Sequence, residues 1–202
     1  MEEKVRISVG KVSLEGRFQA GAVEAGAVIT HPHPLYGGSM DNSVVGAAAR
    51  AFEALGWATL RFNFRGVGES TGAYGGGERE VEDVAAALEF LKARTSGDCF
   101  LVGYSFGAQV AARAMLEGVG AAGVGLISPP IAFMDLAFLP KVPRLRLIIV
   151  GDEDELCPLG DLKKVYKALT PAPELIVLSG TDHFFGGAEE QLFKALRGFS
   201  WR

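Results

Sequence analysis

The chain has 202 residues, of which 49% are hydrophobic and 22% charged, and its formal net charge is −4. This composition is typical of one globular domain, here residues 1–202, and an acidic chain without a basic block is not expected to bind nucleic acid. No apolar run approaches the ~20 residues of a membrane-spanning helix, and the charged start lacks a signal-peptide core, so we expect a cytoplasmic protein with no membrane partner.

The cysteines and the first two histidines give no sign of a metal or cofactor. Cys99 and Cys157 are too few for a disulfide framework and lack metal-ligand spacing. We interpret Cys99 as a buried thiol and Cys157 as a loop thiol. His31 and His33 have no nearby acid or cysteine, so they do not complete a set of metal ligands. The sequence therefore predicts neither a cofactor nor a metal.

Strand and helix patterns alternate along most of the chain. Segments of alternating polarity predict an antiparallel start, at 5–9 and 13–19. Short apolar runs then predict strands at 26–30, 57–62, 99–102, 122–127, 144–150 and 174–178. Helical spacing of apolar residues and end signals predict helices at 44–55, 78–91, 108–116, 161–169 and 188–199. The expected fold is a doubly wound α/β domain, whose mostly parallel sheet is covered by helices on both faces and carries antiparallel N-terminal strands.

Two pentapeptides follow the pattern Gly-x-Ser-x-Gly, which is typical of a serine nucleophile on a tight strand-to-helix turn. In a chain with 27 glycines the pattern alone carries little weight. Ser70 lies in a glycine-rich loop that does not lead promptly into a helix, so we interpret it as a loop residue. Ser105 has a predicted strand before it and a predicted helix after it. Ser105 is therefore the candidate nucleophile, the alternative being a turn serine that only caps the helix.

Chemically active residues collect in loops that follow the predicted strands. The carboxyl ends of parallel strands meet at one edge of a sheet, where ligands and substrates bind. Ser105, an acidic loop after 144–150, and His183 after 174–178 occur in the chain order of an α/β-hydrolase triad. A serine hydroxyl needs a base, and a histidine base needs an acceptor on its other ring nitrogen. His183 is the one histidine that follows the acidic loop.

The acidic loop, 151–158, offers two candidates for that acceptor. Asp154 lies three residues past the glycine that ends the strand, where the chain turns over the sheet. Asp152 is the alternative, although its side chain is equally suited to fixing the loop by accepting backbone N–H groups.

A hydrolytic mechanism also needs two N–H groups aimed at the oxygen that becomes negative. The backbone N–H of Phe106, at the start of the helix after Ser105, is one candidate. The second is expected from the loop after 26–30, where Pro32 and Pro34 have no N–H. His33 and Leu35 remain, and His33 is the first choice because it lies nearer to the end of the strand.

Four segments carry a resemblance that covers nearly the whole chain: 31–38, 61–70, 103–107 and 180–185. They resemble the α/β-hydrolase superfamily, and in particular small bacterial hydrolases related to the dienelactone hydrolases and prolyl-peptidase-like enzymes. The resemblance implies that the acid is the second aspartate of a Gly-Asp-x-Asp loop, here Asp154, and that the histidine motif matches at His183. Many relatives, dienelactone hydrolase among them, have a cysteine nucleophile. Ser105 stands at that position, which favours esterase-type acyl transfer.

Segment 128–143 is short where many members of this superfamily have a large lid. Its run 131–139 is more apolar than an exposed loop requires. We expect either a short flap over Ser105 or simple packing against the sheet edge. In the flap interpretation Leu136 is a further candidate, and the predicted substrate pocket comprises Tyr36, Tyr104, Phe133, Phe138 and Phe184. Arg65 is expected to hold its glycine-rich loop by hydrogen bonds, the alternative being a contact to an acidic substrate group.

The sequence thus predicts a serine hydrolase of a small ester or related acyl compound. The alternatives are a peptidase of short peptides and a non-catalytic binding module on a hydrolase fold. The C-terminal segment 199–202 has the pattern of an exposed tail that could dock on its own domain or on a partner, and the oligomeric state is left open.

Overall fold

The computed structural model describes residues 2–201, and within that range eight strands form one sheet in the order β1-β2-β4-β3-β5-β6-β7-β8. The strands are β1 (Glu3–Val9), β2 (Val12–Gln19), β3 (Ala25–Thr30), β4 (Ala58–Phe62), β5 (Asp98–Tyr104), β6 (Gly123–Ile127), β7 (Leu145–Gly151) and β8 (Glu174–Leu178). β1 and β2 form an antiparallel hairpin, and β2 runs antiparallel to β4. All pairs from β4 to β8 are parallel. The predicted fold class is confirmed.

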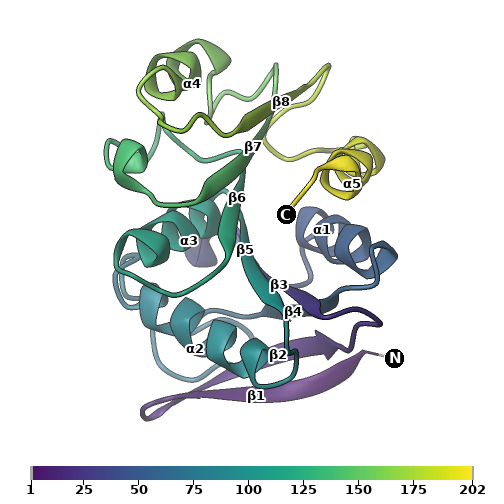
Figure 1. Cartoon of the computed structure of the whole chain (residues 1–202). Coiled ribbons are helices and arrows are strands. Elements are labelled where there is room, and N and C mark those ends of the chain that lie inside the picture. The colour runs from purple at the N-terminus through teal and green to yellow at the C-terminus, as the bar shows by residue number, and fades with distance from the viewer. Residues whose placement is uncertain (1, 202) are drawn as a thin grey trace.

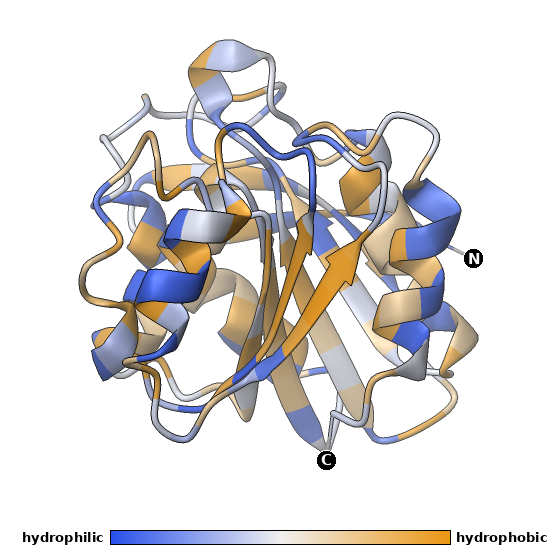
Figure 2. Ribbon diagram, turned by 90° about the horizontal axis from the view of Figure 1, so that it is seen from above, coloured by the Kyte–Doolittle hydropathy of each residue, from blue (hydrophilic) through white to orange (hydrophobic). Residues whose placement is uncertain are grey.

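Helices cover both faces of the sheet, as Figure 1 shows. The helices are α1 (Ser43–Ala54), α2 (Glu80–Lys92), α3 (Phe106–Leu116), α4 (Leu159–Tyr166) and α5 (Glu189–Gly198), with short 3₁₀ turns η1 (Pro34–Tyr36) and η2 (Leu139–Lys141). α1 and α5 pack on one face, and α2, α3 and α4 on the other, each group over its own hydrophobic core. In Figure 2 the central strands and the helix sides that face them are hydrophobic, while the outer helix sides are hydrophilic.

The ends of α1 lie close to the range predicted from the sequence, whereas those of α4 do not. Asn42 caps α1, because its side-chain oxygen accepts the backbone N–H of Val44 at 2.9 Å. α4 begins at Leu159 and ends at Tyr166, whereas the sequence predicted 161–169. Beyond Tyr166 the backbone tightens into three-residue turns, and Pro171 follows, so the α-helical pattern cannot continue.

The C-terminal segment docks on its own chain through Trp201, and Arg202 lies outside the described residues. Trp201 is buried among the rings of Phe52, Trp57 and Phe100, at centroid distances of 5.1, 6.3 and 5.6 Å. Its indole N–H donates to the backbone oxygen of Leu196 at 3.2 Å. This contact closes the core between the sheet and helices α1 and α5, and it answers the question that the sequence left open.

Both cysteines are buried in the described structure. Cys157 follows β7 in a loop as predicted, yet its side chain is fully enclosed, and burial raises the pKa of its thiol well above the ordinary value. Burial also raises the pKa of the Cys99 thiol to about 11. Neither thiol is therefore poised as a nucleophile. Among residues 2–201, no helix combines the length and the apolar character needed to cross a bilayer.

Candidate active site

Ser105 stands on a sharp turn between β5 and α3, with backbone angles φ 54° and ψ −120°. A side chain on either flanking glycine would collide with backbone. A Cβ at Gly103 would lie 2.3 Å from the oxygen of Gly107, and a Cβ at Gly107 would lie 2.7 Å from the oxygen of His31. The backbone N–H of Ser105 donates to Ile127 at 2.9 Å, which ties the turn to the end of β6. The two glycines therefore permit a strained nucleophile turn.

The second pentapeptide has a different role. The hydroxyl of Ser70 donates to the backbone oxygen of Asn63 at 2.7 Å and accepts the backbone N–H of Glu15 at 2.9 Å. These bonds join the loop after β4 to the hairpin strand β2. Ser70 is a structural loop residue, as the sequence predicted.

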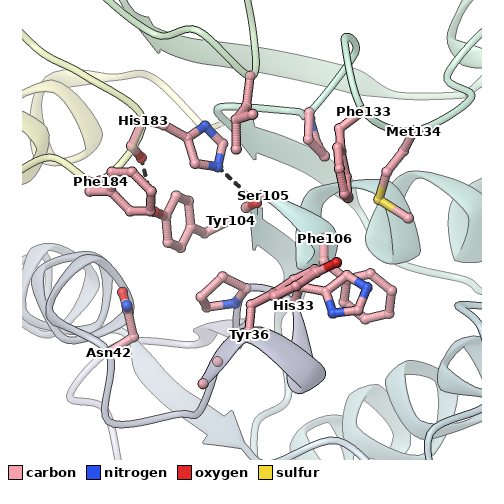
Figure 3. Close-up of a pocket in the computed structure, with 15 residues that line it drawn as sticks. His33, Tyr36, Asn42, Tyr104, Ser105, Phe106, Phe133, Met134, His183 and Phe184 are labelled. Atoms are coloured by element: carbon pink, nitrogen blue, oxygen red, sulfur yellow. Dashed lines mark hydrogen bonds between the residues drawn. The ribbon is translucent and has the colours of Figure 1, made fainter.

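The ends of β5, β7 and β8 bring a serine, an aspartate and a histidine into one hydrogen-bonded row. His183 Nε2 lies 2.9 Å from Ser105 Oγ, and its Nδ1 lies 2.9 and 3.0 Å from the two carboxylate oxygens of Asp154 (Figure 3 shows the first contact). All three side chains are buried to at least nine-tenths. This arrangement has the geometry in which a carboxylate orients an imidazole and the imidazole accepts a hydroxyl proton.

The carboxylate of Asp154 is fixed from both sides. Its Oδ1 accepts the backbone N–H groups of Leu156 and Cys157 at 2.9 and 2.8 Å. Burial alone would raise the pKa of Asp154, but the hydrogen bond from His183 and the backbone N–H of Cys157 hold that pKa below its usual value. The carboxylate is therefore charged at neutral pH.

Asp152, the other candidate acid, lies outside this row. Its carboxylate accepts the backbone N–H of Gly180 at 2.7 Å and the hydroxyl of Ser179 at 3.1 Å. It joins the loop after β7 to the loop after β8, and so supports the segment that carries His183 without contacting the imidazole.

Tyr104 also holds the loop after β8, which carries His183. Its hydroxyl donates to the backbone oxygen of His183 at 2.9 Å, and the two rings lie 5.7 Å apart. The residue before the serine thus holds the backbone of the histidine, while Asp154 orients the histidine side chain.

The two first-choice donors for a negative oxygen follow the neighbouring strands β3 and β5. The N–H of Phe106 is in the first turn of α3, where a helix has no internal acceptor. The N–H of His33 makes no hydrogen bond to any of the residues 2–201. The N–H of Leu35, by contrast, donates to Nδ1 of His33 at 3.2 Å, and the Leu35 side chain is largely exposed. Leu35 is therefore unsuited to the role that the sequence left open for it.

His31 is a structural residue. Its Nδ1–H donates to the backbone oxygen of Pro32 at 2.6 Å, and its Nε2 accepts the backbone N–H of Phe64 at 3.0 Å. Burial lowers the pKa of His31 to about 4, so the ring is neutral. With both nitrogens engaged inside the fold, His31 offers no ligand to a metal.

Ser105 opens into a pocket of about 460 Å³. Figure 3 shows Phe133 and Met134 on one side of the serine and Asn42 and Phe184 on the other. Tyr36, Phe133 and Phe184 form its mouth, with 74%, 60% and 69% of their surfaces exposed. The lining comprises Pro32, His33, Tyr36, Gly37, Gly38, Asn42, Tyr104, Ser105, Phe106, Pro130, Phe133, Met134, Leu156, His183 and Phe184.

Comparison with known proteins places the chain in a family. Residues 35–145, which include Ser105, match the family model described as "Serine aminopeptidase, S33". A serine hydrolase homologue from Coxiella burnetii is 35% identical, with a TM-score of 0.90 over 97% of this chain and 96% of that one. The chain belongs to the α/β-hydrolase superfamily.

Two further relatives are similar over most of their length. A serine hydrolase from Xanthomonas campestris, described as lacking a lid, is 31% identical, with a TM-score of 0.90 over 98% of this chain and 92% of that one. An uncharacterised protein from Rickettsia prowazekii is 34% identical in an alignment of 198 positions that covers 92% of this chain and 83% of the relative.

This hydrolase likewise has no large insertion between β6 and β7 within its described residues; the connection is residues 128–144. Its first half reaches the pocket through Pro130, Phe133 and Met134. Phe138 does not, contrary to the prediction. It packs on the core near Arg113, whose guanidinium lies 5.6 Å from the ring, and Leu136 is buried in that core.

Seven lining residues were not predicted: Pro32, Gly37, Gly38, Asn42, Pro130, Met134 and Leu156. Asn42 caps α1, and that role occupies its oxygen and leaves its amide N–H groups for the pocket. The other six lie in loops after β3, β6 and β7. Their positions at strand ends were a usable signal, but their distances from Ser105 depend on how those loops fold.

Arg65 has the structural role that the sequence favoured. Its guanidinium forms a two-pronged ion pair with the buried carboxylate of Asp83, with a shortest contact of 2.7 Å, and also reaches Glu82 at 3.0 Å. Its backbone N–H donates to Asp83 at 3.0 Å. The loop after β4 is thereby fixed to α2, and Arg65 has no part in the pocket.

Proposed function

We propose that this hydrolase cleaves small uncharged carboxylic esters through an acyl-enzyme intermediate on Ser105. The observation that carries the proposal is the row of hydrogen bonds from Asp154 through His183 to a serine hydroxyl in an apolar pocket. In this proposal Ser105 is the nucleophile, His183 the general base and Asp154 the orienting carboxylate.

The steps of the proposed reaction follow from the contacts that His183 makes with Ser105 and Asp154. Ser105 Oγ bonds to the ester carbonyl carbon while its proton moves to His183 Nε2, and Asp154 stabilises the imidazolium that forms. The N–H groups of Phe106 and His33 stabilise the negative oxygen of the tetrahedral intermediate. The intermediate collapses, and the alcohol leaves with the proton from Nε2. Water then repeats the sequence on the acyl-enzyme, releasing the acid and restoring the Ser105 hydroxyl.

The pocket supports an uncharged substrate. Within the described residues, its lining contains no Asp, Glu, Lys or Arg side chain. The "aminopeptidase" of the family description suggests a peptide substrate, but a free amino terminus carries a positive charge that needs a buried acceptor. The carboxylate of Asp154 is already bound by His183. An ester with apolar groups on either side of its carbonyl fits better.

Covalent labelling combined with an activity screen tests this function. A fluorophosphonate is expected to modify Ser105 in the folded protein and not in Ser105→Ala. Hydrolysis of p-nitrophenyl acetate and butyrate is expected, with kcat lower by roughly 10⁴-fold or more in Ser105→Ala. Cleavage of aminoacyl p-nitroanilides in preference to the esters would favour the peptidase alternative. Absence of any adduct on Ser105 would favour a non-catalytic binding module.

A further inference from the structure

The imidazole of His33 is bound on both of its nitrogens. Nδ1 accepts the backbone N–H of Leu35 at 3.2 Å, and Nε2 lies 3.1 Å from the hydroxyl of Tyr74. A backbone N–H can only donate, so Nδ1 is unprotonated and Nε2–H is the donor to Tyr74. This is the tautomer opposite to that of His31, whose Nδ1 donates and whose Nε2 accepts.

Three aromatic rings hold the same imidazole in place. The centroids of Tyr36, Tyr74 and Phe106 lie 4.8, 5.1 and 4.9 Å from that of His33. The ring of Phe106 also lies 5.8 Å from that of Tyr74. The side chains of the two residues whose N–H groups face a negative oxygen in the proposed mechanism therefore pack directly on each other.

Tyr74 is itself anchored to the start of α2. The buried carboxylate of Glu80 accepts the backbone N–H groups of Gly75 and Gly77 at 2.7 and 2.8 Å. Two hydrogen bonds to one carboxylate give the glycine-rich segment after Tyr74 a fixed path. A continuous set of contacts thus runs from α2 through Tyr74 to His33.

The backbone of His33 is fixed on its carbonyl side as well. Its oxygen accepts the N–H groups of Tyr36 and Gly38 at 3.1 and 3.0 Å, which closes the loop into the 3₁₀ turn η1. The peptide N–H of His33 is then left as the free group of a residue whose side chain and carbonyl are both held. Such a group is preorganised to stabilise charge.

We propose that the His33 imidazole and the Tyr74 hydroxyl are positioning groups that hold the His33 N–H in the oxyanion hole. This inference rests on the proposed function. Neither side chain needs to exchange a proton with the substrate; each acts through the backbone of His33. The effect of losing them is therefore expected on the transition state and not on substrate binding.

The first test is the pair Tyr74→Phe and His33→Asn, with Tyr166→Phe as control. The hydroxyl of Tyr166 is likewise hydrogen-bonded, as a donor to the backbone oxygen of Pro173, but Tyr166 lies on α4 away from the pocket. Tyr74→Phe is expected to lower kcat for p-nitrophenyl acetate about tenfold, and His33→Asn by at least as much, with KM changed less than about twofold. Tyr166→Phe is expected to leave both constants unchanged.

A double variant sharpens the test. Asparagine at position 33 can still accept the Leu35 N–H but is too short to reach Tyr74. Adding Tyr74→Phe to His33→Asn is therefore expected to lower kcat no further. Affinity for a trifluoromethyl ketone, which forms a tetrahedral adduct with the serine, is expected to fall by the same factor as kcat in each single variant. Independent, multiplicative losses would overturn the proposal.

The wild-type protein supplies a readout that needs no variant. Nitrogen-15 NMR of the three imidazoles is expected to show His33 as the Nε2–H tautomer, and His31 and His183 as Nδ1–H tautomers. An Nδ1–H tautomer at His33 would overturn the proposal.

The outcomes also separate this proposal from the proposed function. If Tyr74→Phe has the wild-type kcat while fluorophosphonate still labels Ser105, the positioning role is overturned and the proposed function survives. Failure of wild type to be labelled or to hydrolyse any ester overturns both.

Discussion

Replacing Asp154 by asparagine changes which nitrogen of His183 carries the proton. Oδ1 of Asp154 accepts two backbone N–H groups, from Leu156 and Cys157. The amide oxygen of asparagine must keep that place, because an NH₂ group cannot face two donors. The amide nitrogen then stands at the Oδ2 position, 3.0 Å from Nδ1 of His183. It can only donate, so it competes with the amide oxygen at the Oδ1 position, 2.9 Å from Nδ1, and favours an unprotonated Nδ1 with the proton on Nε2.

The expected loss of activity follows from that tautomer. Nε2–H would point at Ser105 Oγ, 2.9 Å away, where the mechanism needs an acceptor. Loss of the carboxylate also removes the charge that stabilises the imidazolium. A wrong tautomer with otherwise intact geometry lowers kcat by about 10⁴-fold in a serine triad. This corresponds to about 5 kcal/mol of transition-state stabilisation.

Asp152→Asn is a matched control from the same loop. The change is chemically identical and two residues away, but the Asp152 carboxylate contacts Gly180 and Ser179 and not the imidazole. We expect kcat within about twofold of wild type, since exposed polar substitutions have small effects. The assay is steady-state hydrolysis of p-nitrophenyl acetate, accompanied by denaturant unfolding of each variant to verify that it is folded.

Two results would refute this reasoning. One is a folded Asp154→Asn protein that keeps more than about 1% of the wild-type kcat. The other is an Asp152→Asn protein as impaired as Asp154→Asn, which would make Asp152 the orienting acid.

Two other predictions concern stability and substrate choice. Burial lowers the pKa of His31 from 6.5 to about 4, so the unfolded chain binds a proton that the folded protein rejects, and stability is present above pH 6.5 and lost as the pH falls towards 4. The variant His31→Gln keeps an acceptor for the Phe64 N–H but has no group that titrates in this range. From pH 7 to pH 5 the free energy of unfolding, measured with urea, should fall by about 2 kcal/mol more in wild type than in this variant. Equal losses in the two proteins would contradict this prediction. Phe133→Ala should reduce the preference for p-nitrophenyl butyrate over acetate several-fold, because it removes an apolar wall of the pocket, whereas Phe138→Ala should leave that ratio unchanged although it weakens the core. An unchanged ratio in Phe133→Ala would show that this side chain does not contact the acyl group.

The sequence by itself was sufficient for the alternation of strands and helices and for the choice between the two serines. Hydrophobic periodicity is a local property, and so is the presence of a strand before and a helix after Ser105. The order of serine, acid and histidine is also written along the chain, and parallel strands bring their carboxyl ends to one edge whatever the details of the loops. These local features are sufficient to point to Ser105 and His183.

The choice between the two aspartates of the acidic loop could not be made from the local sequence. Asp152 and Asp154 have the same chemistry and nearly the same position, and only the folded loop directs one toward His183 and the other toward Gly180. Leu35 failed as a donor because its N–H is bound by a side chain two residues away, and Phe138 failed as a pocket residue because its ring packs on the core near Arg113.

Tertiary structure likewise decided the place of Trp201 and the role of Tyr74. Trp201 fills a space bounded by rings from α1, β5 and the segment before β4, which approach one another only after the sheet has formed. Tyr74 meets His33 across 41 positions of sequence. Contacts of this kind depend on side-chain direction and on packing between distant segments. Neither can be inferred from the hydrophobic periodicity or the motif spacing of the sequence.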